Sequence, residues 1–178
     1  MRRGNVLAAQ RHRQAGLVFD TNILLLFVVS RISELWIPKV KRLQAQGFRF
    51  ETEDARWIRD FSSRFRCIWT TPHILTEFNN LTENLDRHLR DFIWREVQKW
   101  ASVDAEPLRE SRKPFRELGS IEAYLPFGVA DAALVALAQQ NRLVLTIDRD
   151  LSKYLEESSL PVLNYNYIRQ ERLGLYEG

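Results

Sequence analysis

Two apolar stretches that each run into an aspartate, LVFDTN at residues 17–22 and LVLTID at residues 143–148, decide the fold class of this chain. Short runs of this kind predict buried strands over 17–19 and 143–147, so that Asp20 and Asp148 follow the carboxyl ends of strands. Strands alternate with helical segments along the chain. The sequence therefore predicts an α/β fold in which a parallel central sheet is flanked by helices, and sheets of this kind bind ligands at the carboxyl ends of their strands.

Two further segments predict helices that carry acids. Residues 67–69 predict a short strand, and the Thr-Thr-Pro sequence ending at Pro72 is typical of a helix start, which places Glu77 on the following helix. Gly128 precedes VADAALVALAQQ, whose composition predicts a mostly buried helix. Asp131 then lies in the first turn of that helix.

The rest of the chain gives weaker signals. Residues 23–66 predict two helices joined by a loop, and we expect 27–66 to form an extended helical arm after the first strand. Residues 86–103 repeat apolar positions at helical spacing and predict an amphipathic helix. Residues 105–119 contain two prolines and mixed charges, which favours a surface loop. Residues 162–163 predict a last strand.

Length and composition indicate one domain. The chain has 178 residues, of which 45% are hydrophobic, enough for one core and too few for two ordinary domains. We expect a basic leader over residues 1–15, as a disordered tail or as a segment that binds nucleic acid or an acidic partner, and a single domain over 16–178. The longest apolar run, 17–29, is shorter than the roughly 20 residues of a membrane helix. We therefore expect a cytoplasmic protein with no membrane contact.

Charge and cysteine content leave several partner classes open. The net charge of +3 and the pI of about 9.2 permit a polyanionic partner without requiring one. Cys67 is the only cysteine, so no intrachain disulfide can form, and we expect a buried, inert thiol. The three histidines lack the spacing typical of a zinc site.

Four acids occupy positions from which their side chains could converge: Asp20, Glu77, Asp131 and Asp148. Carboxylates about 4 Å apart repel by about 4 kcal/mol per pair at an effective dielectric of 20. A divalent cation removes this repulsion, and Mg²⁺ and Mn²⁺ prefer oxygen ligands. The pattern therefore predicts a site for phosphate chemistry with Mg²⁺ or Mn²⁺.

The chain resembles the PIN-domain family of nucleases at four motifs: LVFDTN at 17–22, TPHILTEFNN at 71–80, GVADAALVALA at 128–138 and LVLTID at 143–148. The resemblance implies a three-layer PIN-like fold and a divalent-metal-dependent endoribonuclease that hydrolyses phosphodiester bonds of single-stranded RNA. It makes the four acids both the catalytic and the metal-binding residues, with Asn22 and Thr146 as site support. No other cofactor is implied. An antitoxin protein and a second copy of the chain are possible partners.

Three functions stay open at this point. The chain could be the toxin of a toxin-antitoxin pair, although the separation of Asp20 from Glu77 is longer than in compact toxin members. It could also be an RNA-processing nuclease of the same fold, or a nucleic-acid-binding module that does not cut.

Each candidate residue also has a plainer structural explanation. Asp20 and Asp148 could cap helices, Asp131 could favour the dipole of its helix, and Glu77 could be a solvated helix residue. Thr146 could be no more than a good strand residue. Arg112, Lys113 and Arg116 could contact substrate phosphates or form an ordinary solvated surface.

Overall fold

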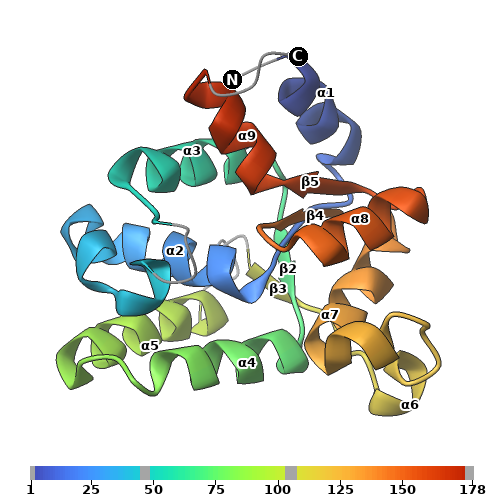
Figure 1. The fold of residues 1–178 in the computed structure, drawn as a ribbon. Helices are drawn as coiled ribbons and strands as arrows, with labels where there is room; N and C mark the ends of the chain where they lie inside the picture. Colours follow the sequence, from blue (N-terminus) through green and yellow to red (C-terminus); the bar gives the residue numbers. More distant parts are fainter. Residues whose placement is uncertain (1–2, 45–48, 103–107, 175–178) are drawn as a thin grey trace.

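The computed structural model describes residues 3–44, 49–102 and 108–174, and its sheet consists of five parallel strands (Figure 1). The strands are β1 (Leu17–Phe19), β2 (Ile68–Thr70), β3 (Leu108–Glu110), β4 (Leu143–Thr146) and β5 (Val162–Asn164). Their order across the sheet is β3-β2-β1-β4-β5, and every neighbouring pair is parallel. The predicted α/β class and parallel sheet are confirmed. β1 is central, and the strand order reverses between β1 and β4.

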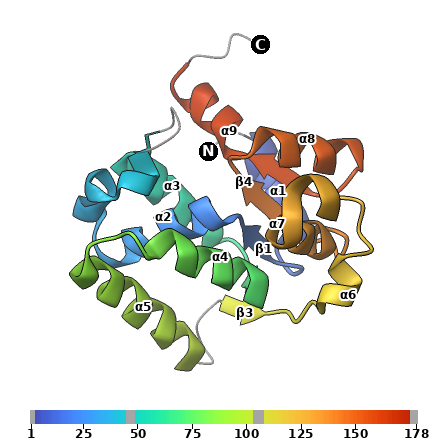
Figure 2. The same cartoon turned by 60° about the horizontal axis from the view of Figure 1, so that its bottom comes forward.

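Helices cover both faces of the sheet, as a parallel sheet requires. They are α1 (Arg3–His12), α2 (Thr21–Ile32), η1 (Glu34–Lys39), η2 (Lys41–Gln44), α3 (Thr52–Ser62), α4 (Pro72–Thr82), α5 (Arg87–Ser102), α6 (Phe115–Leu118), α7 (Tyr124–Ala138), α8 (Arg149–Glu157) and α9 (Tyr165–Arg172). Helices α2, α3, α4 and α5 gather on one side of the sheet, and α1, α7 and α8 lie on the other (Figures 1 and 2). Helix α4 packs against both α2 and α7.

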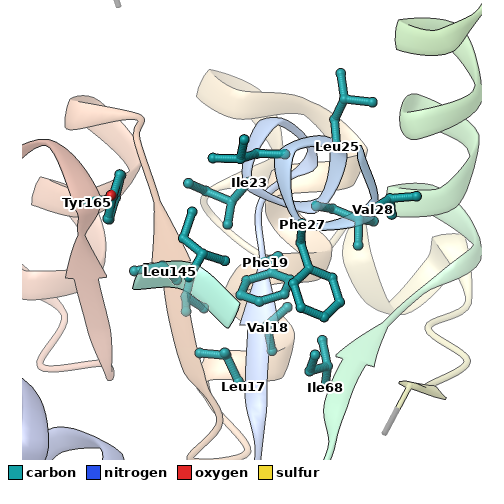
Figure 3. Close-up of a cluster of buried hydrophobic side chains, with 14 of the residues drawn as sticks. Leu17, Val18, Phe19, Ile23, Leu25, Phe27, Val28, Ile68, Leu145 and Tyr165 are labelled. Carbon is teal, nitrogen blue, oxygen red and sulfur yellow. The ribbon is translucent and has the colours of Figure 1, made fainter. Parts of the chain in front are cut away.

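The core is built around α2, which follows directly from β1. Every residue from Ile23 to Val29 is buried, because this helix is apolar on all sides and has elements packed around it. The ring centroids of Phe19 on β1 and Phe27 on α2 are 5.1 Å apart, and Figure 3 shows these rings together inside the core. Burial on this scale fixes the junction of β1 and α2, where Asp20 lies.

The segment after the first strand is helical, as predicted, but it is not an arm. Ile37 on η1, Leu43 on η2 and Ile58 on α3 are all fully buried, so these helices pack onto the core. They do so because each presents an apolar face toward α2. Residues 45–48, which belong to the predicted arm, lie outside the described residues.

Two other predictions are wrong. Of the two alternatives for the basic leader, the disordered tail is wrong, because residues 3–12 form α1, in which Ala9 is buried and the ring Nδ1 of His12 lies 2.9 Å from the carbonyl oxygen of Asn141. The segment 105–119 was expected to be a loop, but it contains β3 and α6. Residues 105–107 of that segment are outside the described residues.

Several smaller predictions are confirmed. The strand predicted at 67–69 is present one residue later, as β2, and residues 87–102 form the predicted amphipathic helix, α5. Cys67 is buried, and burial raises the pKa of its thiol. Among the described residues, no helix is both long enough and apolar enough to cross a bilayer.

Candidate functional site

Two of the predicted acids, Asp20 and Asp148, lie where the strand order reverses, at the carboxyl ends of β1 and β4. Chain segments leaving these two strands turn to opposite faces of the sheet, which opens a crevice at this position in doubly wound folds. Asp20 directly follows β1, and Asp148 follows β4 with one residue between them. The fold therefore brings together two acids that are far apart in the sequence.

Asp20 is held from both strands. Its side chain is only 6% exposed, and its Oδ1 accepts a hydrogen bond from the amide of Ile23 at 2.8 Å, which caps α2. Its Oδ2 accepts from the hydroxyl of Thr146 at 2.5 Å and from the amide of Ile147 at 2.8 Å. Burial raises the pKa of Asp20 despite these hydrogen bonds, which lower it, and the charge of Asp148 raises it further.

Thr146 connects Asp20 to Asp148. Its fully buried hydroxyl donates to Asp20 and accepts from the amide of Asp148 at 2.9 Å. The Oδ1 of Asp148 accepts from the amides of Asp150 and Leu151 at 2.8 and 2.9 Å and so caps α8. The capping role considered for Asp20 and Asp148 is therefore real, and it fixes the orientation of both carboxylates.

Glu77 reaches the same edge from α4. Its Oε2 accepts a hydrogen bond of 2.5 Å from the hydroxyl of Thr21, the residue next to Asp20. Glu77 is exposed, so this contact and the packing of α4 on α2 determine where its carboxylate lies. The sequence reasoning missed Thr21, although a hydroxyl next to a predicted site acid was the available signal.

Asp131 completes the group of four. The backbone of Gly128 has a φ of 85°, which kinks α7 and starts a fresh helical turn just before Asp131. The pKa of Asp131 is raised to about 7, first by burial and then by the charges of Glu77, Asp20 and Asp148. No basic side chain in the described part of the chain offsets this repulsion at Asp131. The charges of the three other predicted acids thus all act on Asp131.

The donor chemistry of this group fits Mg²⁺ or Mn²⁺, because every available ligand is a carboxylate oxygen. Within residues 3–44, 49–102 and 108–174, however, no three Asp, Glu, His or Cys side chains are grouped closely enough to hold one ion. Joint coordination would therefore require side chains to move closer together. Glu77 and Asp148 are the exposed members of the group.

The predicted supporting and basic residues lie on several elements. Asn22 accepts a hydrogen bond from Nε of Arg42 on η2 at 3.2 Å, so its amide oxygen faces a cation. The segment that carries Arg112 and Lys113 is fixed to the carboxyl edge of the sheet, because the ring Nε2 of His73 lies 2.9 Å from the carbonyl oxygen of Lys113. Lys113 donates to Glu117 at 2.7 Å, whereas Arg112 and Arg116 are exposed.

Two asparagines near the site were also missed. The side-chain amide of Asn164 donates to the carbonyl oxygen of Asp148 at 3.2 Å, and that of Asn166 donates to the carbonyl oxygen of Ile147 at 2.6 Å. Both therefore brace the turn that carries Asp148. Their position at the end of the last strand and just after it, at the predicted ligand edge, was the only signal in the sequence.

Comparison of the chain with models of protein families, with curated proteins and with solved structures finds no match.

Proposed function

We propose that this chain is a PIN-like, divalent-metal-dependent endoribonuclease that hydrolyses phosphodiester bonds of single-stranded RNA. The proposal is supported by Asp131, whose pKa is raised to about 7 by burial and then by the charges of Glu77, Asp20 and Asp148, three acids from other parts of the chain. A cluster of this kind is costly for the folded protein unless a cation binds to it. Perturbed pKa values of this origin occur preferentially at functional sites.

The four acids would hold Mg²⁺ or Mn²⁺, and three of them have a defined support. Thr146 and two backbone amides orient Asp20, α8 and Asn164 orient Asp148, and Thr21 positions Glu77. When bound, a divalent cation lowers the pKa of water that attacks phosphorus and neutralises charge on the phosphate. The basic segment at the same sheet edge is available to contact phosphates of the RNA.

A purely structural role accounts for only half of the group. Asp20 and Asp148 cap α2 and α8, and helix capping alone justifies an aspartate at each of these positions. Asp131 and Glu77 cap no helix, since α7 and α4 begin at other residues. Glu77 accepts a hydrogen bond from Thr21, and Asp131 lies in the turn that restarts after Gly128. Neither role requires an acid whose charge acts on the pKa of another acid, which favours a functional site.

A second candidate is a nucleic-acid-binding module that does not cut. It is favoured by the finding that, in the described parts of the chain, no three acids already occupy ligating positions. A toxin role, in which an antitoxin protein covers the four acids and the chain dimerises, is a narrower version of the nuclease proposal. Arrest of growth on expression, relieved by the Asp131→Asn substitution, would support it.

The deciding experiment is incubation of the purified protein with end-labelled single-stranded RNA in Mn²⁺, in Mg²⁺ and in chelator. We expect cutting only with metal, and its loss in the Asp20→Asn and Asp131→Asn variants. Asp91→Asn is the matched control, because it makes the same change on the exposed surface of α5. Cutting in chelator, or undiminished cutting by Asp131→Asn, would contradict the proposal. RNA binding without cutting would favour the second candidate.

A further inference from the structure

A cavity of about 290 Å³ lies between α1 and the loop that follows α3. Its lining residues are Val6, Ala9, Gln10, Arg13 and Arg64. The cavity thus combines an apolar wall from α1 with one amide and two guanidinium groups. Sites for small organic ligands commonly have this composition, in which a few polar groups stand among apolar ones. The two cations make this cavity a candidate site for a small anion.

The two arginines extend from backbone that is held in place. Phe65, next to Arg64, is only 6% exposed, and its ring centroid lies 5.2 Å from that of Phe61 on α3. The amide of Arg66 donates to the carbonyl oxygen of Arg13 at 3.0 Å. This hydrogen bond joins the loop after α3 to the residue that follows α1, so the backbone positions of Arg13 and Arg64 are fixed relative to each other.

No carboxylate in the described part of the chain pairs with either arginine. None lines the cavity, and Arg13 and Arg64 make no ion pair with a described acid. Asp60 is one helical turn before Arg64 but does not pair with it. Two like charges that share a cavity repel each other, and an anion bound between them removes this repulsion.

The amino edge of the sheet, to which both arginines belong, is basic as a whole. The described loops that lead into the amino ends of strands are 13–16, 63–67, 139–142 and 158–161, and their charged residues are Arg13, Arg64, Arg66 and Arg142. The loop 103–107 lies outside the described residues, and its sequence has two acids, so arginines outnumber acids over all these loops. Nη1 of Arg142 is buried and has no hydrogen-bond partner in the described part of the protein. The field at this edge therefore attracts anions.

A plainer role for these arginines is to stabilise the ends of helices. Arg13 and Arg64 follow the ends of α1 and α3, where a cation interacts favourably with the helix dipole. That role requires neither a shared cavity nor the lack of a carboxylate partner. Other arginines of α3 are neutralised, since Arg56 and Arg59 both pair with Glu34. The two unpaired arginines at one cavity thus favour a binding site.

We propose that this cavity binds a phosphate monoester, with the terminal phosphate held between Arg13 and Arg64. A guanidinium group donates two parallel hydrogen bonds to phosphate oxygens, and the amide of Gln10 donates another. A terminal phosphate carries close to two negative charges at neutral pH, which match the two arginines, whereas an internal phosphodiester carries one. The organic part of the ligand lies against Val6 and Ala9. This site is at the opposite edge of the sheet from the four acids and does not depend on the proposed nuclease.

The test is titration calorimetry of the full chain in chelator and low salt, with adenosine monophosphate as the probe and adenosine as its uncharged counterpart. Saturable binding of adenosine monophosphate is expected, and none of adenosine. Arg13→Gln and Arg64→Gln are each expected to weaken binding at least about tenfold, the effect of losing one charge-assisted pair. Arg87→Gln removes an exposed arginine at the start of α5 and is expected to bind like the wild type. Circular dichroism checks that each variant is folded.

Two results would overturn the phosphate site. One is the absence of saturable binding by the wild type, both with adenosine monophosphate and with inorganic phosphate. The other is equal affinity of the wild type, Arg13→Gln and Arg64→Gln for adenosine monophosphate, because the probe would then bind elsewhere.

Free nucleotides and RNA ends both carry a terminal phosphate, and RNA oligonucleotides with and without that phosphate separate these two sources. Tighter binding of the phosphorylated RNA, lost in Arg64→Gln, would assign the cavity to RNA ends. Equal affinity for both RNAs, together with binding of adenosine monophosphate that depends on Arg64, would assign it to free nucleotides.

Discussion

Replacing Asp131 by Asn is expected to stabilise the metal-free protein, and increasingly so as the pH rises. The pKa of Asp131 is raised from 3.8 to about 7 in the folded chain, so the folded state holds this proton more tightly than the unfolded state does. Below pH 3.8 both states are protonated and Asp131 costs no stability. Between the two pKa values only the unfolded state ionises, and wild-type stability falls. Above pH 7 the full cost remains.

The size of the effect follows from the shift. One pKa unit corresponds to about 1.4 kcal/mol, so a shift of about three units has a ceiling of about 4 kcal/mol. Asp131 is partly exposed, and solvent and salt screen the charges of Glu77, Asp20 and Asp148. We therefore expect the stability of Asp131→Asn relative to the wild type, measured as free energy of unfolding in low salt, to be about 1 to 3 kcal/mol higher at pH 8 than at acid pH.

The assay is urea unfolding followed by tryptophan fluorescence, in chelator and low salt, at pH 5 and pH 8. At each pH, the free energy of unfolding of the wild type is subtracted from that of the variant. The two differences, one at pH 5 and one at pH 8, are then compared. Any effect of Asn that is independent of pH cancels in this comparison. Asp91→Asn is the control and is expected to show no such change. If the difference for Asp131→Asn were the same at both pH values, the four acids would not interact as described.

Three further predictions concern residues that stabilise the fold or support the site. Gly16→Ala is expected to lower the free energy of unfolding, measured by urea titration, by about 2 kcal/mol or more. The reason is that φ of Gly16 is +101° and the new Cβ would lie 2.7 Å from the ring of Trp69. A loss below about 0.5 kcal/mol would refute this. Thr146→Val is expected to reduce the rate of RNA cutting at least about tenfold, because it removes the hydroxyl that donates to Asp20, whereas Thr146→Ser keeps a hydroxyl and is expected to stay active. Equal cutting rates for the Val and Ser variants would contradict this. Asp54→Ala is expected to lower the free energy of unfolding, measured by chemical denaturation, by about 3 kcal/mol. The reason is that buried Asp54 pairs with two arginines of α9, which would lose their partner. Unchanged stability would contradict this prediction.

The elements that carry the acids could be predicted because local sequence determines them. The apolar runs before Asp20 and Asp148 have no stable position except inside a sheet, and Gly128 followed by an alanine-rich run specifies where a helix restarts. The carboxyl edge was predictable for the same reason, since it follows from parallel strands. The positions of these acids relative to the predicted strands and helices are therefore enough to predict which edge of the sheet they approach.

The missed elements depend on long-range pairing. Strand β3 has the sequence Leu-Arg-Glu, which has no strand signal of its own and is ordered by pairing with β2 at the edge of the sheet. Helix α1 has a basic, weakly apolar sequence, and it is fixed by burial of Ala9 and by the contact of His12 with Asn141. The roles of Thr21 and Asn166 are equally invisible in the sequence, because a hydrogen bond between segments depends on which strands become neighbours.

We propose that the four acids bind divalent metal jointly, and titration calorimetry with Mn²⁺ in the absence of RNA tests this most directly. The wild type is expected to bind Mn²⁺ with a saturable isotherm. Four variants are each expected to weaken this binding at least about tenfold, or about 1.4 kcal/mol: Asp20→Asn, Glu77→Gln, Asp131→Asn and Asp148→Asn. Asp91→Asn is expected to bind like the wild type. Absence of Mn²⁺ binding by the wild type, or equal binding by the Asp20 and Asp131 variants, would contradict the claim.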